Sequence, residues 1–175
     1  YIVLATIPGG AIGFLLDHFC QNALNMPIII AIALIVMGIV LYIVDKNAKN
    51  KVKYEEMTLK QTFTIGLSQA LAFIPGVSRS GITITTARAM GVTREAATKF
   101  SFLLSTPIVF AATVLKFKDF VFSIPFIIGV LASFLVGLVV IKFLLKYIKK
   151  GSFKVFAIYR VIVGLLIIIV TIIKN

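Results

Sequence analysis

A short polar stretch inside a hydrophobic chain holds the residues best suited to chemistry, Pro75-Gly76-Val77-Ser78-Arg79-Ser80-Gly81. Arginine keeps its charge at any physiological pH, and its planar fork of N–H donors matches phosphate oxygens. Glycine lets the backbone come close to a ligand. The residues that could contact one here are Gly76, Ser78, Arg79, Ser80, Gly81 and Thr83. Because these types combine positive charge, hydroxyls and no carboxylate, they indicate a phosphate or diphosphate site.

The backbone around this stretch favours the same ligand. Pro75 is expected to end one helix, and Ser80 is expected to cap the next one. The free N–H groups and the dipole at a helix N-terminus attract anions. Gln69 lies two helical turns before Pro75 and is placed to reach the same ligand. The alternative is a purely structural turn whose arginine binds helix carbonyls.

The two segments that flank the turn are too short to cross a membrane. At about 1.5 Å per residue, residues 60–74 cover roughly 22 Å and residues 80–91 roughly 18 Å. A bilayer has a hydrocarbon core of about 30 Å. A re-entrant hairpin over residues 60–92, entering and leaving on one side, fits these lengths. Its irregular tip would have to be buried in protein or line a wet cavity, and an arginine there marks a functional site.

The composition places the whole chain in the membrane. Of 175 residues, 60% are hydrophobic and 14% are charged, against about 25% charged in soluble domains. The mean hydropathy is +1.09. The net charge of +12 does not indicate nucleic acid, because the basic residues lie mainly in short segments between apolar runs. The single Cys20 excludes an internal disulfide, and the lone His18 has no partner ligands nearby, so no metal site is expected.

The predicted fold class is all-α, a polytopic membrane protein with five transmembrane helices plus one re-entrant hairpin. The expected spans are residues 1–16, 27–44, 94–115, 122–146 and 155–173. Thr93 is the expected N-cap of the third span, with Glu95 in its first turn. The first residue is Tyr1 and already lies inside an apolar run, so we expect a fragment that lacks its start.

The distribution of lysine and arginine supports the hairpin independently. If the basic loop 46–59 is cytoplasmic, a hairpin over residues 60–92 returns Arg88 and Arg94 to the same side. The second basic segment, between residues 142 and 154, then falls there too. This arrangement follows the positive-inside rule, whereas a single crossing by residues 60–92 would put the two basic clusters on opposite sides.

Other polar residues have more ordinary explanations. The series Gln61, Thr64 and Ser68 is best explained by hydrogen bonds between helices. For Arg160, near the start of the last span, snorkelling or a carbonyl contact is expected rather than catalysis. The Asp and Glu residues all lie at span ends or in loops. Hydrolysis of a phosphoanhydride needs a general base or a metal-holding carboxylate, so these segments supply the anion cradle without that partner.

The residues at this point resemble a known family, the bacterial undecaprenyl-pyrophosphate phosphatases of the bacitracin-resistance type. The likeness lies in QALAFIPGVSRSGIT at 69–83 and AMGVTREAA at 89–97, and continues in FSFLLSTP at 100–107 and FAIYR at 156–160. The resemblance implies hydrolysis of undecaprenyl diphosphate to undecaprenyl phosphate, which recycles the lipid carrier for cell-wall synthesis. It also implies a multi-pass protein of the bacterial inner membrane.

The family fold has two inverted repeats, each a re-entrant hairpin followed by three spans. By this resemblance residues 1–45 are the last two spans of the first repeat and residues 60–175 are the second repeat. The first hairpin, which carries acidic residues, a serine pair and a histidine in the family, is missing, and His18 does not match that histidine. The piece alone is therefore expected to be inactive.

The resemblance also assigns roles. Ser78 and Arg79 are expected to be catalytic, and Gly76, Ser80, Gly81, Thr83 and Gln69 to bind substrate. A divalent cation, Mg or Ca, is implied by the family alone, and a homodimer is a further expectation. Two other classes stay open: a polyprenyl-phosphate flippase or anion transporter on the same fold, and a structural membrane subunit.

Overall fold

The computed structural model describes residues 1–3, 5–7, 9, 12, 26–117, 120 and 122–174. The helices are α2 (Pro27–Asn47), α3 (Leu59–Ser68), α4 (Arg79–Ala89), α5 (Arg94–Leu115), α6 (Ile124–Lys150) and α7 (Lys154–Lys174), with 3₁₀ turns at Tyr54–Glu56 and Gln69–Phe73. Every regular element in the described part of the chain is helical, apart from one isolated bridge between Val52 and Val92. The predicted all-α fold is confirmed.

Four of these helices are long and apolar enough to cross a membrane: α2, α5, α6 and α7. They coincide with the predicted spans to within a few residues at each end, and α5 has the predicted bounds. The chain is a multi-pass membrane protein. The further span predicted at residues 1–16 lies largely outside the described residues.

Local capping explains where several helices begin. The hydroxyl of Thr93 accepts the amide N–H of Ala96, so the predicted cap of α5 is confirmed. Ser123 accepts from Phe126 at the start of α6 in the same way. Pro27 occupies the first turn of α2, where its missing N–H has no helical partner to lose.

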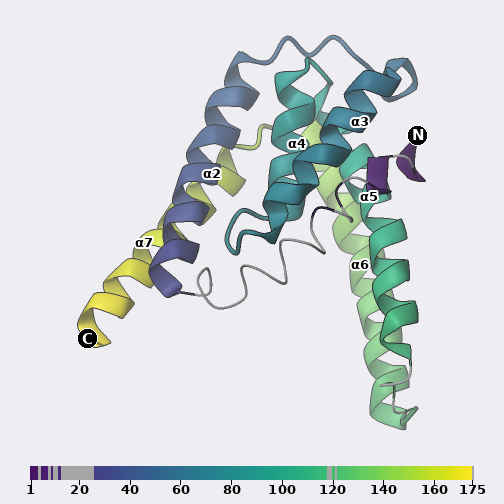
Figure 1. Ribbon diagram of the computed structural model, residues 1–175, viewed down its shortest axis with the longest axis vertical. Helices are drawn as coiled ribbons and strands as arrows, with labels where there is room; N and C mark the ends of the chain where they lie inside the picture. The colour runs from purple at the N-terminus through teal and green to yellow at the C-terminus, as the bar shows by residue number, and fades with distance from the viewer. Residues whose placement is uncertain are drawn as a thin grey trace.

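The helices α2 and α7 pack closely against each other, and two glycines allow it. A Cβ on Gly38 would lie 3.0 Å from the carbonyl oxygen of Ala157, and one on Gly164 would lie 2.8 Å from that of Ala31. Small residues at such crossings let two membrane helices approach until their backbones touch. This pair forms one side of the molecule in Figure 1, and α5 with α6 forms the other.

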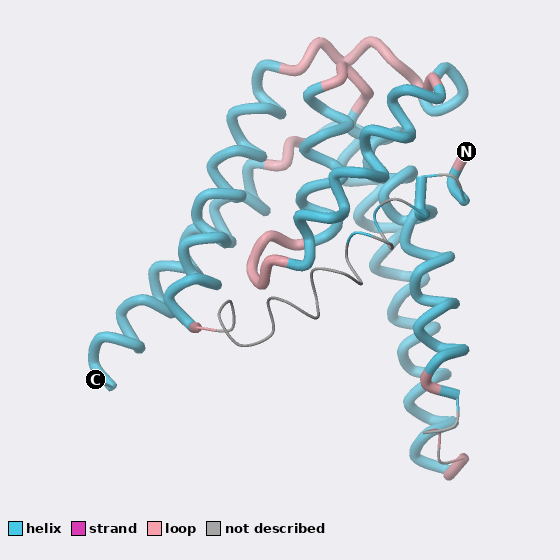
Figure 2. Tube along the Cα trace, viewed as in Figure 1, coloured by secondary structure: helices cyan, strands magenta, loops and turns pink. Residues whose placement is uncertain are grey.

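Residues 59–89 form a helical hairpin between these two pairs. The first arm is α3 followed by the 3₁₀ turn Gln69–Phe73, and the second arm is α4. Figure 2 shows the non-helical turn that joins them, and it lies between the two ends of the molecule rather than at either one. The prediction of two helices meeting at residues 75–81 is confirmed. The second helix was expected over residues 80–91, but α4 begins one residue earlier and ends two residues earlier, at Arg79 and Ala89.

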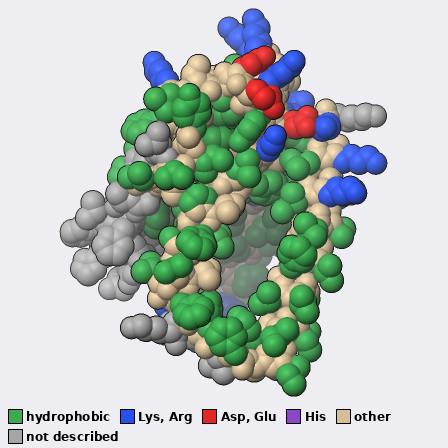
Figure 3. Space-filling model, turned by 90° about the vertical axis from the view of Figure 1, so that its right-hand side faces the viewer, with side chains coloured by type: hydrophobic (Ala, Val, Ile, Leu, Met, Phe, Trp, Pro, Cys, Tyr) green, Lys and Arg blue, Asp and Glu red, His purple; other side chains and the backbone are tan. Residues whose placement is uncertain are grey.

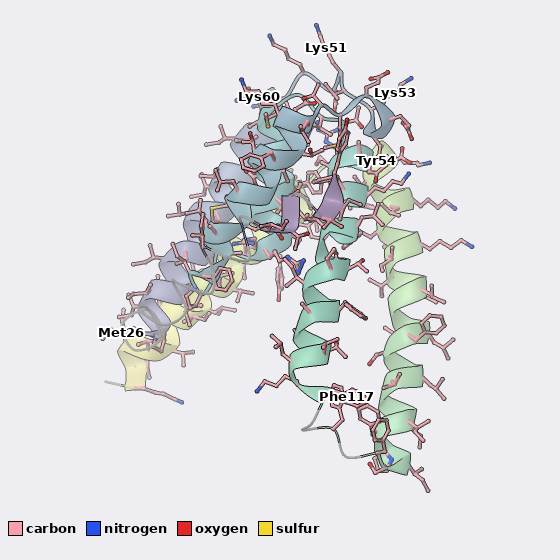
Figure 4. The ribbon with its side chains drawn as sticks, turned by 45° about the vertical axis from the view of Figure 1, so that its right-hand side comes forward. Met26, Lys51, Lys53, Tyr54, Lys60 and Phe117 are labelled. Carbon is pink, nitrogen blue, oxygen red and sulfur yellow. The ribbon has the colours of Figure 1, made fainter. Side chains whose placement is uncertain are left out.

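The two ends of the molecule differ in charge. Figure 4 places Lys51, Lys53 and Lys60 at one end, and Met26 and Phe117 towards the other. In Figure 3 the basic and acidic side chains gather at the first end, above a surface that is mostly hydrophobic. Both arms of the hairpin begin or end at this charged end, as the distribution of basic residues predicted.

A buried carboxylate anchors the hairpin at the charged end. Asp45, which is 3% exposed at the end of α2, accepts Nε of Arg88 at 2.7 Å and Nε of Arg94 at 2.9 Å. Its second oxygen accepts the amide N–H of Phe153 at 3.3 Å. Burial lowers the pKa of Arg88, and the hydrogen bond and charge of Asp45 oppose that shift. Asp45 therefore joins α2, α4, α5 and the start of α7, a role that the sequence analysis did not predict.

Candidate anion site

The turn between the arms has an unusual backbone. Gly76 has φ +92° and Ser78 has φ +66°, a left-handed conformation that non-glycine residues rarely adopt. The hydroxyl of Ser78 accepts the N–H of Gly81 at 3.3 Å. Ser78 is therefore the N-cap of α4, and the expectation that Ser80 caps this helix is wrong. Because the helix begins one residue earlier than expected, Arg79 is its first helical residue.

Arg79 connects three elements around this turn. Its Nε donates to Oε1 of Gln69 at 3.0 Å, and its Nη2 donates to the carbonyl oxygen of Leu104 in α5 at 3.1 Å. The structure pairs Nη1 with no acceptor among the described residues. The side chain is only part-buried. Arg79 thus makes one of the carbonyl contacts that the structural alternative predicted, and still keeps N–H donors for a ligand.

Gln69 acts through Arg79 in this structure. It is 2% exposed, and its Nε2 donates to the carbonyl oxygen of Gly66 at 3.4 Å. With both ends of its amide engaged, Gln69 has little freedom to contact a ligand directly. The prediction that it binds substrate stays a prediction, and the geometry shows that it orients the arginine.

A second arginine approaches the turn from the last helix. Nη2 of Arg160 donates to the carbonyl oxygens of Gly76 at 2.7 Å and Val77 at 2.8 Å, and Nε donates to that of Leu34 at 3.4 Å. The carbonyl contact expected for Arg160 is confirmed. Two of these carbonyls belong to the residues just before Ser78, so Arg160 also holds the turn in its left-handed conformation.

The remaining predicted residues fall into two groups. Ser78 and Ser80 are exposed, and their hydroxyl oxygens lie 3.5 Å apart beside the first turn of α4. Thr83, by contrast, is 1% exposed and its hydroxyl lies 2.8 Å from that of Ser101 in α5. Thr83 also donates to the carbonyl of Arg79 at 3.0 Å. The structure places it between two helices, one turn away from the open side of the site.

A cavity of about 230 Å³, which we call the tip cavity, adjoins the start of α4. Its polar lining is Ser78, Ser80, Thr98 and Arg160, together with the backbone of Gly81. The other lining residues are the apolar or aromatic Leu41, Ile84, Phe102, Leu144, Phe153, Phe156 and Tyr159. No acidic residue is among the described residues that line it. A cavity with cationic and hydroxyl groups on an apolar wall suits a molecule that has an anionic head and an apolar chain.

The described residues do not by themselves fit a divalent cation. No group of three or more His, Cys, Asp or Glu side chains comes together within them. The turn offers guanidinium, hydroxyl and N–H groups, which bind anions rather than metal ions. Carboxylates for a cation would have to come from outside this group of residues.

Sequence reasoning found the turn and its arginine but missed how they are held. The predicted residues Gly76, Ser78, Arg79, Ser80 and Gly81 do lie together. The sequence analysis expects a carbonyl contact for Arg160 but does not predict that the carbonyls belong to the turn. One signal was available: charged residues inside apolar spans are rare and tend to pair with backbone carbonyls or mark a site.

Known proteins resemble this chain over most of its length. A family model described as "Bacitracin resistance protein BacA" matches residues 1–166. The chain is 47% identical over 97% of its length to an undecaprenyl-diphosphatase from Pelotomaculum thermopropionicum, and 44% identical over 100% to one from Desulforudis audaxviator. A third, from Enterococcus faecalis, is 36% identical over 97% of the chain. The chain spans 65%, 68% and 65% of these relatives.

Proposed function

The chain belongs to the bacitracin resistance protein BacA family, and from that membership we propose that the protein hydrolyses undecaprenyl diphosphate to undecaprenyl phosphate and inorganic phosphate. The relatives named above are called undecaprenyl-diphosphatases. The single observation that carries the proposal is the turn before α4. There Arg79 is the first residue of α4, and the two exposed serines on either side of it line a largely apolar cavity.

The proposed membrane arrangement has five spans and a re-entrant hairpin over residues 60–92 in the bacterial inner membrane. Residues 1–45 are the proposed end of a first repeat, 46–59 a cytoplasmic loop and 60–175 a second repeat. The position of the turn between the two ends of the molecule supports a hairpin that reaches about halfway. The basic side chains gather at the end of the molecule where the hairpin begins. Since cytoplasmic loops carry an excess of lysine and arginine, this supports a cytoplasmic location for that end.

In this proposal the described residues bind and neutralise the substrate. Hydrolysis breaks the bond between the bridging oxygen and the terminal phosphorus, and a water oxygen forms the new bond. Negative charge moves onto the phosphoryl oxygens and the leaving phosphate in the transition state. We propose that Nη1 of Arg79 and the N–H groups of the first turn of α4 face that charge. In other enzymes, removal of one such hydrogen-bond donor lowers the rate by about 10²–10³-fold. Ser78 and Ser80 position the diphosphate.

The group that takes the proton from water is proposed to lie outside the described residues. The turn carries no carboxylate or histidine. A divalent cation belongs to the same proposal, with its ligands also outside the described residues. A homodimer stays a prediction, and light scattering of the detergent-solubilised protein tests it.

The decisive experiment measures inorganic phosphate released from undecaprenyl diphosphate by the full-length protein in detergent. The proposal expects release by the wild type and none by Arg79→Ala. The runner-up, a polyprenyl-phosphate flippase or anion transporter, expects no release from either protein, because a carrier breaks no bond. If the protein is a structural membrane subunit, substitutions at residues 76–83 should reduce activity only where they also reduce folding. Near-normal turnover by Arg79→Ala would contradict the assignment.

A further inference from the structure

One nitrogen of Arg160 has no partner in the described part of the chain. Nη2 and Nε donate to three carbonyl oxygens, but Nη1 has no acceptor. The residue as a whole is 8% exposed, and no fully buried side-chain nitrogen or oxygen among the described residues lacks a partner, so Nη1 keeps some accessible surface. A guanidinium is a donor on all its nitrogens. Nη1 therefore has capacity for an acceptor from outside the chain.

The position of Nη1 is fixed by the start of α4. A Cβ on Gly81 would lie 2.8 Å from Nη1 and 3.3 Å from the hydroxyl oxygen of Ser78. Nη1 thus packs on Gly81 close to Ser78, and Arg160 belongs to the lining of the tip cavity. The absence of a side chain on Gly81 is what makes room for the guanidinium there.

The rest of the cavity lining is apolar and comes from several helices. Phe102 belongs to α5, Leu144 to α6, and Phe156 and Tyr159 to α7. A volume of about 230 Å³ is smaller than the roughly 300–1,000 Å³ of pockets that enclose a drug-sized ligand. The cavity can therefore hold a short apolar segment next to an anionic group, but not a long lipid chain.

We propose that the tip cavity binds the head-proximal part of an isoprenoid diphosphate. Nη1 of Arg160 and the hydroxyls of Ser78 and Ser80 contact phosphate oxygens, and the apolar walls contact the isoprene unit attached to the diphosphate. The remainder of the chain stays in the bilayer. This inference rests on the proposed function, because it places the first carbon atoms of undecaprenyl diphosphate in the tip cavity. It gives Arg160 a contact with substrate in addition to its hold on the turn.

Photolabelling tests the location directly. The full-length protein in detergent is irradiated with a prenyl diphosphate that carries a diazirine on its first isoprene unit, and the labelled residues are identified by mass spectrometry. We expect label on α7 between residues 156 and 160 or at Leu144, displaced by undecaprenyl diphosphate and not by phosphatidylglycerol. Label confined to residues outside the cavity lining overturns the inference, and so does equal displacement by the phospholipid.

A pair of substitutions tests the same point by kinetics. Leu144→Trp fills the cavity from α6, whereas Leu138→Trp makes the same change on that helix at a residue that is 54% exposed. We expect KM for undecaprenyl diphosphate to rise about tenfold or more in the first, with kcat changed much less, and to stay unchanged in the second. An unaltered KM in a folded Leu144→Trp protein overturns the inference; if that protein does not fold, Leu144→Phe is measured instead.

The two proposals fail in different ways. Wild-type protein that is labelled in the cavity but releases no phosphate contradicts the hydrolase and keeps the cavity assignment. Wild-type protein that releases phosphate but is labelled elsewhere keeps the hydrolase and contradicts the cavity assignment.

Discussion

Arg79 and Gln69 bridge the two arms of the hairpin through a hydrogen bond of 3.0 Å between Nε and Oε1. Ten residues separate them in sequence, and the turn brings them together. The bond uses the arginine nitrogen nearest the backbone, so the outer nitrogens remain for other contacts. Nη2 donates to the carbonyl oxygen of Leu104, and Nη1 has no acceptor among the described residues. The orientation of the guanidinium is therefore set before any ligand binds.

Gln69→Leu should weaken catalysis without abolishing it. The change removes the acceptor of Arg79 Nε, and a hydrogen bond to a charged group contributes about 1.5–3 kcal/mol. Since about 1.4 kcal/mol corresponds to a factor of ten, we expect kcat/KM to fall roughly 10- to 100-fold. Gln61→Leu is the control on the same arm, because its side chain caps α3 and contacts Met90 but not Arg79. A control that loses as much activity as Gln69→Leu would contradict the specific role of the Gln69–Arg79 bond.

Arg79→Lys should lose most of the activity, and Arg79→Ala all that is measurable. Lysine keeps one positive charge but has a single nitrogen, so it cannot bind Gln69, the carbonyl of Leu104 and a phosphate in the same geometry. We expect a loss of at least about 10²-fold in kcat for lysine, of the size seen when a transition-state donor is removed. Phosphate release under saturating substrate measures it. A lysine variant with wild-type kcat would show that charge alone suffices.

Asp45→Asn should destabilise the protein far more than an exposed charge change. Arg88 is fully buried against Asp45, and removing one partner of a buried ion pair costs about 3–5 kcal/mol. Glu95→Gln removes an exposed pair with Lys149, for which about 0–1 kcal/mol is typical. Thermal unfolding in one detergent compares the two variants. Equal midpoints would mean that Asp45 does not hold the charged end of the hairpin together.

Gly76→Ala should be much more damaging than Gly91→Ala, although both glycines have positive φ. The left-handed backbone costs an alanine about 1–2 kcal/mol at either position. A Cβ on Gly76 would also lie 2.4 Å from the carbonyl oxygen of Ile30, whereas one on Gly91 meets nothing within 4 Å. We expect Gly76→Ala to lower both stability and activity and Gly91→Ala to lower stability slightly. Thermal unfolding and phosphate release on both variants check this, and similar stability in the two would contradict the predicted collision.

The sequence by itself determined the features that depend on local pattern. Long apolar runs specified the spans, and the short arms on either side of Pro75 and Gly76 specified a hairpin. The residue types around Arg79 predicted an anion site, and that stays a prediction. The helices and the hairpin could be predicted because helix length, hydropathy and capping are properties of neighbouring residues, as the cap at Thr93 illustrates.

Only the tertiary structure decided which distant residues complete the site. Arg160 reaches the carbonyl of Gly76 across 84 positions, and Asp45 reaches the amide of Phe153 across 108. Such contacts depend on how each helix is rotated and packed against its neighbours, which no local pattern encodes. The same holds for Ser78, whose left-handed backbone makes it the cap in place of Ser80. That conformation is held by the carbonyl contacts of Arg160, a residue of a helix that follows much later in the chain.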